Sequence, residues 1–146
     1  TITNLYNDTY YWTVIAIDDL GNVGDSKDAR GFLVDTDAGQ VTLVSPINGF
    51  ATNDTTPILT WTTATDSTGV DSHVVEVSKN STFTNLKFVD TIDGSLTSDT
   101  VLPFLAEDTY YWRVIAIDDL GNTVASGTFR GTGLPWSLSR TAWMSS

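Results

Sequence analysis

The chain has 146 residues, which is enough for one ordinary domain with its own core and too little for two complete ones. Its 7 basic and 18 acidic side chains give a net charge of −11, so binding to nucleic acid or to an anionic membrane surface is disfavoured. The lack of cysteine and the single histidine exclude disulfides, thiolate metal sites and sites with several histidines, and no apolar run is long enough for membrane insertion.

The first 34 residues contain a segment that returns later in the chain. Residues 8–22 and 108–122 are identical at 14 of 15 positions, and only Thr13 and Arg113 differ. An offset of 100 residues is typical of tandem domains rather than of solenoid turns. We therefore expect residues 1–34 to be the last two strands of a preceding repeat, paired as a hairpin of residues 10–18 and 29–34. Aligning Phe32 with Phe129 then requires a three-residue deletion in the second copy.

A linker is predicted at residues 35–40, and residues 41–131 have the length of one complete repeat. Thr, other β-branched residues and aromatic residues dominate this stretch, and no part of it has the apolar period of a helix. An all-β sandwich is therefore predicted. Its seven strands are expected at residues 41–45, 56–62, 72–78, 86–92, 98–102, 109–118 and 123–130.

Alternation along the strands predicts which side chains face the core. The inward residues are Leu59, Trp61, Val75, Val77, Tyr110, Trp112, Val114 and Ala116. The opposite face of the sixth strand carries Arg113 together with Tyr111, Ile115 and Ile117, and the last three make it unusually apolar for a sheet that faces water. We expect this interaction face to be covered by a neighbouring repeat or by the tail at residues 132–146. The tail has no counterpart in the first copy, and we expect either a divergent terminal segment or a segment foreign to the natural protein.

Three motifs resemble the fibronectin type III-like and bacterial immunoglobulin-like modules of prokaryotic surface proteins. They are Thr-Pro-Ile-Leu-Thr-Trp at 56–61, Ser-Thr-Phe-Thr at 81–84 and the aromatic segment at 109–122. The resemblance covers the complete repeat and most of residues 1–37. It implies a seven-stranded sandwich whose second-to-third and sixth-to-seventh strand loops lie together where the chain enters. It also implies an extracellular or cell-surface location, in a stalk, an adhesin repeat or a linker beside a carbohydrate-active enzyme.

Acidic side chains gather in the loops that the resemblance places together. The candidate ligands for calcium are Asp35, Asp37, Asp66, Asp71, Asp118, Asp119 and Asn122. Calcium binds six to eight hard oxygen atoms, which carboxylates, an amide and loop carbonyls can supply. The alternative is that Asp-Asp-Leu-Gly-Asn at 118–122 is a turn with Asp accepting backbone N–H bonds, while the other acids confer solubility.

These features favour a non-enzymatic extracellular module, a spacer or adhesion repeat whose partners are neighbouring repeats. Carboxylate catalysis needs an acid in an apolar pocket, whereas nearly all acids here fall in wet loops, and inward-facing His73 is expected to be a hydrogen-bonded core residue. One alternative is a carbohydrate-binding accessory module that stacks glycans on rings such as Tyr111, Phe104, Trp136 and Trp143. Another is a self-assembling unit in which residues 1–34 add to a sheet of the same or another molecule, because a lone hairpin is marginal in water.

Overall fold

The structure is a computed structural model that describes residues 2–25 and 28–133. The tail from residue 134 onward, including Trp136 and Trp143, lies outside the described residues. Within the described residues, no helix has the length and apolar character needed to span a membrane. The chain divides into two compact units, Thr1–Asp37 and Ala38–Ser146.

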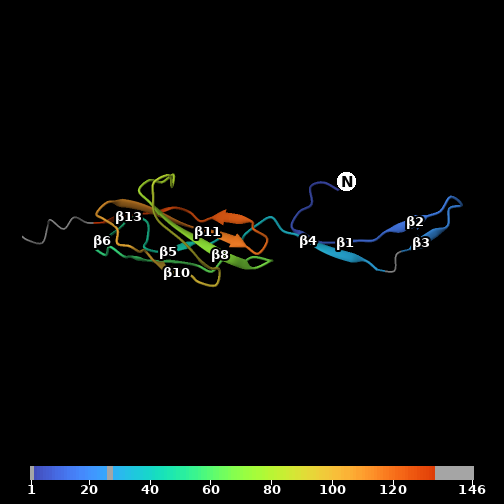
Figure 1. The fold of residues 1–146 in the computed structure, drawn as a ribbon, viewed down its shortest axis with the longest axis horizontal. Coiled ribbons are helices and arrows are strands. Elements are labelled where there is room, and N and C mark those ends of the chain that lie inside the picture. Colours follow the sequence, from blue (N-terminus) through green and yellow to red (C-terminus); the bar gives the residue numbers. More distant parts are fainter. Residues whose placement is uncertain (1, 26–27, 134–146) are drawn as a thin grey trace, which may run out of the picture. The chain divides into compact units, whose positions relative to one another are not determined.

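The first unit is an antiparallel ribbon (Figure 1). Its strands are β1 (Asp8–Trp12), β2 (Ile15–Ile17), β3 (Val23–Asp25) and β4 (Arg30–Val34). Strand β1 pairs with β4 and β2 pairs with β3. The predicted hairpin is therefore present, although its first strand, at 10–18, is broken into β1 and β2, and β3 was not predicted. Its origin in a preceding repeat stays a prediction.

The register of the ribbon corrects the alignment of the two copies. Trp12 lies opposite Arg30 in the ribbon, whereas Trp112 lies opposite Phe129 in the second unit. The counterpart of Phe129 is therefore Arg30, and the second copy is shorter by one residue rather than three. The alignment through Phe32 was wrong because it matched the type of side chain, while strand register is set by the turn and by backbone pairing.

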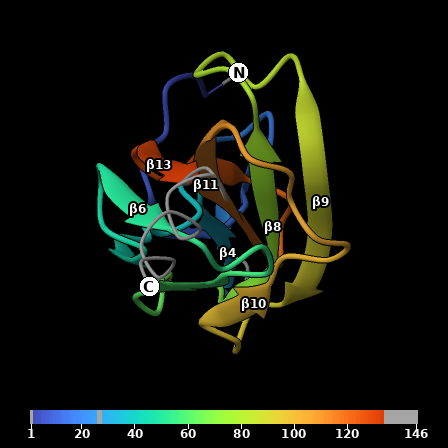
Figure 2. The ribbon, with the colours of Figure 1, turned by 90° about the vertical axis from the view of Figure 1, so that its left-hand side faces the viewer.

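The second unit is a two-layered β-sandwich. Its strands are β5 (Leu43–Ser45), β6 (Phe50–Thr52), β7 (Ile58–Trp61), β8 (Val70–Ser78), β9 (Leu86–Asp93), β10 (Ser98–Thr100), β11 (Thr109–Asp118), β12 (Thr123–Ala125) and β13 (Phe129–Gly133). One sheet has the order β10-β7-β5, and the other has the order β6-β13-β11-β8-β9 with β12 also paired to β11. Figure 2 shows β9, β8, β11 and β13 following one another in the larger sheet.

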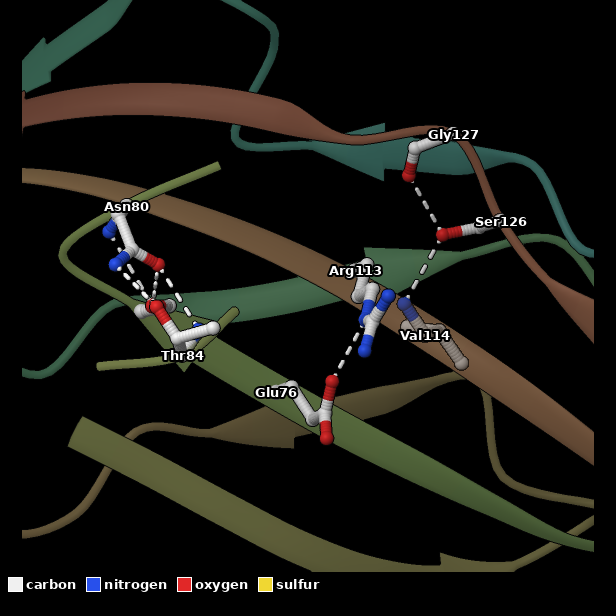
Figure 3. A network of polar contacts seen from close by, with 8 residues as sticks. Glu76, Asn80, Thr84, Arg113, Val114, Ser126 and Gly127 are labelled. Atoms are coloured by element: carbon white, nitrogen blue, oxygen red, sulfur yellow. Dashed lines mark hydrogen bonds and ion pairs between the residues drawn. The ribbon is translucent and has the colours of Figure 1, made fainter. Parts of the chain in front are cut away.

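All seven predicted strands are present, with two differences. Strand β6 was not predicted, and it pairs in parallel with β13 through only three residues. The strand predicted at 123–130 is broken into β12 and β13 near Ser126. The Ser126 hydroxyl accepts the N–H of Val114 at 3.0 Å and donates to the carbonyl of Gly127 at 2.7 Å (Figure 3). At the break, the Ser126 hydroxyl is therefore the acceptor for a backbone N–H of β11, a role that a backbone carbonyl has elsewhere in the sheet.

The core lies between the two sheets and confirms the predicted inward faces. Buried side chains include Leu59, Trp61, Val75, Val77, Trp112, Val114 and Ala116. Tyr110 is half-buried against this core, and its hydroxyl donates to the carbonyl of Ala106 at 3.0 Å. In the ribbon the Tyr10 hydroxyl makes the same bond to the carbonyl of Tyr6 at 3.0 Å. Each bond ties the start of a strand to the loop that precedes it.

Candidate functional site

The turn between β11 and β12 is built around the carboxylate of Asp118. One oxygen, Oδ1, accepts the N–H groups of Leu120 at 2.9 Å and Asn122 at 2.7 Å, and Oδ2 accepts Asn122 Nδ2 at 2.7 Å. Gly121 has a φ of 87°, which suits a glycine in a tight turn. Burial disfavours the charged carboxylate, but the bonds from Asn122, Leu120 and Gly121 outweigh it, so the pKa of Asp118 lies below its usual value.

The same turn forms in the ribbon. Asp18 accepts the N–H groups of Leu20 at 2.9 Å and Asn22 at 2.8 Å, and its Oδ2 accepts Asn22 Nδ2 at 2.7 Å. The side-chain and backbone bonds from Asn22 are the main reason that the pKa of Asp18 is lowered. Asp118 is 2% exposed whereas Asp18 is exposed, so the geometry does not depend on the surrounding sandwich. This agreement favours the turn interpretation of Asp-Asp-Leu-Gly-Asn.

The loop between β7 and β8 meets this turn, as the resemblance implied. Asp66 Oδ1 accepts the N–H of Thr68 at 2.9 Å and its hydroxyl at 2.8 Å, and the same hydroxyl lies 3.4 Å from Asp118 Oδ2. Gly69 has a φ of 102°, and a Cβ placed on it would lie 3.1 Å from Oδ2 of Asp119. Asp66, Asp118, Asp119 and Asn122 are therefore gathered at one end of the sandwich.

The other three candidate ligands belong to other elements. Asp71 is exposed on β8, and its backbone carbonyl accepts the N–H of Gly94 at 2.9 Å. Asp35 and Asp37 belong to the first unit, where Asn7 Nδ2 donates to Asp35 Oδ1 at 3.3 Å and to Asp37 Oδ2 at 2.8 Å. The candidate set is thus divided between the two units. The calcium site and the alternative of turn and solubility roles for these acids both stay predictions.

The predicted interaction face is half-buried and carries a charged pair. Tyr111, Ile115 and Ile117 are each partly covered, and β8 and β12 flank the last two. In the same row, Arg113 Nε donates to Glu76 Oε2 at 2.6 Å (Figure 3). The pairing of Arg113 with Glu76 was not predicted from the sequence. The one available signal was that Arg113 is the only position where the two copies of the 15-residue segment differ.

A turn between β8 and β9 covers Arg113. The guanidinium Cζ of Arg113 lies 4.1 Å from the ring centroid of Phe83, a cation–π contact. Phe83 is 8% exposed and has a φ of 55°, a left-handed conformation that costs an ordinary residue about 1–2 kcal/mol. Asn80 closes the turn, because its Oδ1 accepts the N–H of Thr84 at 3.0 Å and its Nδ2 donates to the Thr84 hydroxyl at 2.8 Å (Figure 3). The turn therefore holds Phe83 in place over the charged pair.

His73 is fully buried in the core, as predicted. Neither ring nitrogen has a hydrogen-bond partner among the described residues, and the ring packs edge-on against Trp61 with centroids 5.6 Å apart. Burial lowers the pKa of His73, while the backbone of Leu96 and the charge of Asp93 act in the opposite direction. Its burial confirms the predicted core position, which the ring fills by edge-on packing.

A cavity of about 70 Å³ lies at the other end of the sandwich from the Asp118 turn. Leu105, Tyr110 and Trp112 line it on one side and Pro46 on another. The cavity is much smaller than the roughly 300–1,000 Å³ of an ordinary ligand pocket. Among the rings suggested for glycan stacking, Phe104 is exposed and Tyr111 is half-buried.

Comparisons with known proteins identify the fold. No family model and no curated protein matches the chain. Among solved structures, an Fn3-like protein from Clostridium thermocellum matches with a TM-score of 0.50 and 22% identity, over 68% of this chain and 97% of that one. The chain has a fibronectin type III-like fold. A fold of this type fits a non-catalytic module, and the Tyr110 bond to Ala106 is its tyrosine corner.

Two further matches have TM-scores of 0.48. One is the fibronectin type III domain of a human fibronectin type III domain containing protein 3, with 19% identity over 75% of this chain and 98% of that domain. The other is the pectate lyase Pel3 from Pectobacterium carotovorum, with 18% identity over 64% of this chain. The chain spans only 27% of the length of that pectate lyase.

Proposed function

We propose that the protein is a non-catalytic structural module of an extracellular protein, a spacer or adhesion repeat that sets the separation of neighbouring domains. The resemblance to surface modules supports the extracellular location. The observation that supports a spacer concerns residues 35–42, which connect the two units. Residues 35–37 are held by contacts within the first unit, and residues 38–42 are held by contacts within the second.

On the ribbon side, Asn7 fastens the residues that leave β4. Its Oδ1 accepts the N–H of Thr36 at 3.0 Å and the Thr36 hydroxyl at 2.7 Å, while its Nδ2 donates to Asp37 Oδ2 at 2.8 Å. A single side chain therefore holds both of these residues, and the stretch behaves as an extension of the ribbon.

On the sandwich side, the next residues are packed or bonded at once. Ala38 and Val41 are each 1% exposed, and the N–H of Thr42 donates to the Thr62 hydroxyl at 3.0 Å. A Cβ placed on Gly39 would lie 2.5 Å from the carbonyl oxygen of Thr65, and the φ of Gly39 is 64°, so only glycine fits. No run of loose residues remains in the connection, which is the property that a spacer requires.

The distance between spin labels on the two units tests the proposal. Because the chain contains no cysteine, Thr9→Cys and Lys87→Cys supply two unique labelling sites. We expect a narrow distance distribution, and Asn7→Ala should broaden it because residues 35–37 lose their fastening. The matched control, Asn53→Ala, removes an exposed asparagine away from the connection and should leave the distribution unchanged. A broad distribution in the otherwise unchanged chain would overturn the spacer role.

A further inference from the structure

The described residues contain two strand pairs whose first strands are nearly identical in sequence, and one set of strands that can bury such a strand. In the sandwich, Trp112 and Val114 on β11 are 4% and 0% exposed. Their counterparts in the ribbon, Trp12 and Val14, are 50% and 58% exposed. The sandwich itself therefore shows which surface covers this sequence, namely the inner face formed by β8 and the sheet β10-β7-β5.

We infer that the β1–β4 ribbon can take the place of β11–β13 in the sandwich of a second copy of this chain, and that Arg113 is the residue that favours β11 over the ribbon. The partner is thus another molecule of the same protein. This inference is independent of the stiffness of the connection proposed above.

The first strand of the ribbon fits the vacated position because its inward side chains are identical to those of β11, whereas β4 would place Arg30 where Phe129 packs on Trp112. Tyr10, Trp12, Val14 and Ala16 repeat the residues at 110, 112, 114 and 116. The register of β11 on β8 would place Thr13 opposite Glu76 and Ile15 opposite Val74. Strand β4 would bring Phe32 to the position of Gly131, beside the apolar cavity. A Cβ placed on Gly131 has its nearest neighbour at 3.5 Å, which is an ordinary van der Waals contact.

The length of the connection excludes exchange within one molecule. In the exchanged position Leu33 would lie where Thr132 lies, opposite Thr109 at the start of β11. Ala38, in contrast, is fixed at the far end of β11, where Gly39 packs on Thr65. These two places are separated by the length of β11, about 30 Å at roughly 3.3 Å per residue. Five residues reach at most about 18 Å. A ribbon from a second copy has no such restriction.

Arg113 distinguishes the two otherwise equivalent strands. The side chains of Arg113 and Glu76 are 29% and 13% exposed, and their 2.6 Å contact lies beneath Phe83. A threonine cannot form an ion pair, so the ribbon would leave the largely buried carboxylate of Glu76 without its guanidinium. The covalent connection from β10 also favours β11, and exchange therefore requires a high protein concentration.

Engineered disulfides report which strand lies on β8. In Val74→Cys/Ile115→Cys, the native register should give a disulfide within one chain. In Val74→Cys/Ile15→Cys, exchange should give a disulfide between two chains. Both proteins are refolded at about 1 mM, oxidised and separated without reductant. We expect Arg113→Thr to increase the intermolecular product of the second pair about fivefold, and Thr13→Arg to increase it similarly, since the first weakens β11 and the second strengthens the ribbon.

Three controls make the result specific. Thr9→Arg adds the same charge to β1 at a position that would not face Glu76, and it should leave the yield unchanged. Val74→Cys/Tyr11→Cys tests the register, because Tyr11 would face Ser78 instead, and should give little product. The pair Val74→Cys/Ile115→Cys, placed in the Arg113→Thr background, verifies that this variant still folds.

Several results would overturn the inference. The absence of an intermolecular disulfide between positions 74 and 15 in every background rejects exchange. A disulfide between these positions within one chain rejects the second copy as partner. Equal yields of the intermolecular product with and without the Arg113→Thr change reject the selecting role of Arg113.

Discussion

Replacing Trp112 by alanine is expected to destabilise the sandwich far more than the same change at Trp12. Trp112 is 4% exposed and packs edge-on against Phe129 with ring centroids 5.9 Å apart. Burial of an aromatic side chain removes about 150–250 Å² of surface from water, which is worth roughly 4–6 kcal/mol at about 25 cal/mol per Å². Trp→Ala changes in protein cores lower the free energy of unfolding by about 3–5 kcal/mol. Trp12 is 50% exposed and belongs to the first unit. Its replacement should change the unfolding free energy of the sandwich by less than about 0.5 kcal/mol.

Urea unfolding followed by far-ultraviolet circular dichroism measures both variants without depending on the fluorescence of the deleted ring. With a slope of about 1–3 kcal/mol per M, Trp112→Ala should lower the midpoint of the sandwich transition by about 1 M or more at constant slope. Trp12→Ala serves as the matched control, because the 15-residue segments around the two tryptophans differ only at Thr13 and Arg113. Equal shifts for the two variants, or a loss below about 1 kcal/mol for Trp112→Ala, would refute the core position assigned to β11.

Three further predictions concern titration, calcium and the turn. Lowering the pH from about 7 to about 5 should destabilise the sandwich, because burial lowers the pKa of His73 and the unfolded chain therefore takes up the proton more readily than the folded one. The urea midpoint of His73→Phe should depend less on pH than that of the unchanged chain. An equal pH dependence of the two midpoints would contradict this account. The melting temperature with about 2 mM calcium should lie within about 2 °C of the melting temperature with a chelator, because Asp66 and Asp118 already accept hydrogen bonds from their own loops. A rise of several degrees would instead establish a calcium site. Asp118→Ala should lower the melting temperature of the sandwich by calorimetry, whereas Asp18→Ala should leave that transition unchanged, and equal effects would be inconsistent with separate units.

The sequence was sufficient to predict the strands and their inward faces, because a two-residue period identifies a buried face without knowledge of its partner. Trp61, Val75 and Trp112 were found in this way. Strand β6 was not, since three residues paired in parallel with a distant strand leave no local pattern. The break at Ser126 was also missed, because it depends on a hydroxyl bond to the backbone of a neighbouring strand.

The candidate site was predicted less completely, for a related reason. The residues of the Asp118 turn are close in sequence, so their grouping was accessible from Asp-Asp-Leu-Gly-Asn alone. The pairing of Arg113 with Glu76 depends on strand register, and the contact with Phe83 depends on a left-handed residue in a turn. The environment of His73 depends on tertiary packing. None of these relations can be read from the order of residues.

The turn that occurs in both units also bears on how the chain folds. Its hydrogen bonds join residues no more than four positions apart, and they are the same around Asp18, in a bare ribbon, and around Asp118, in a sandwich. Hairpins closed by such local contacts form in about 1–10 μs, before distant strands can be brought together. The segment at 108–122 is therefore expected to order first and to serve as the template on which β8 later pairs.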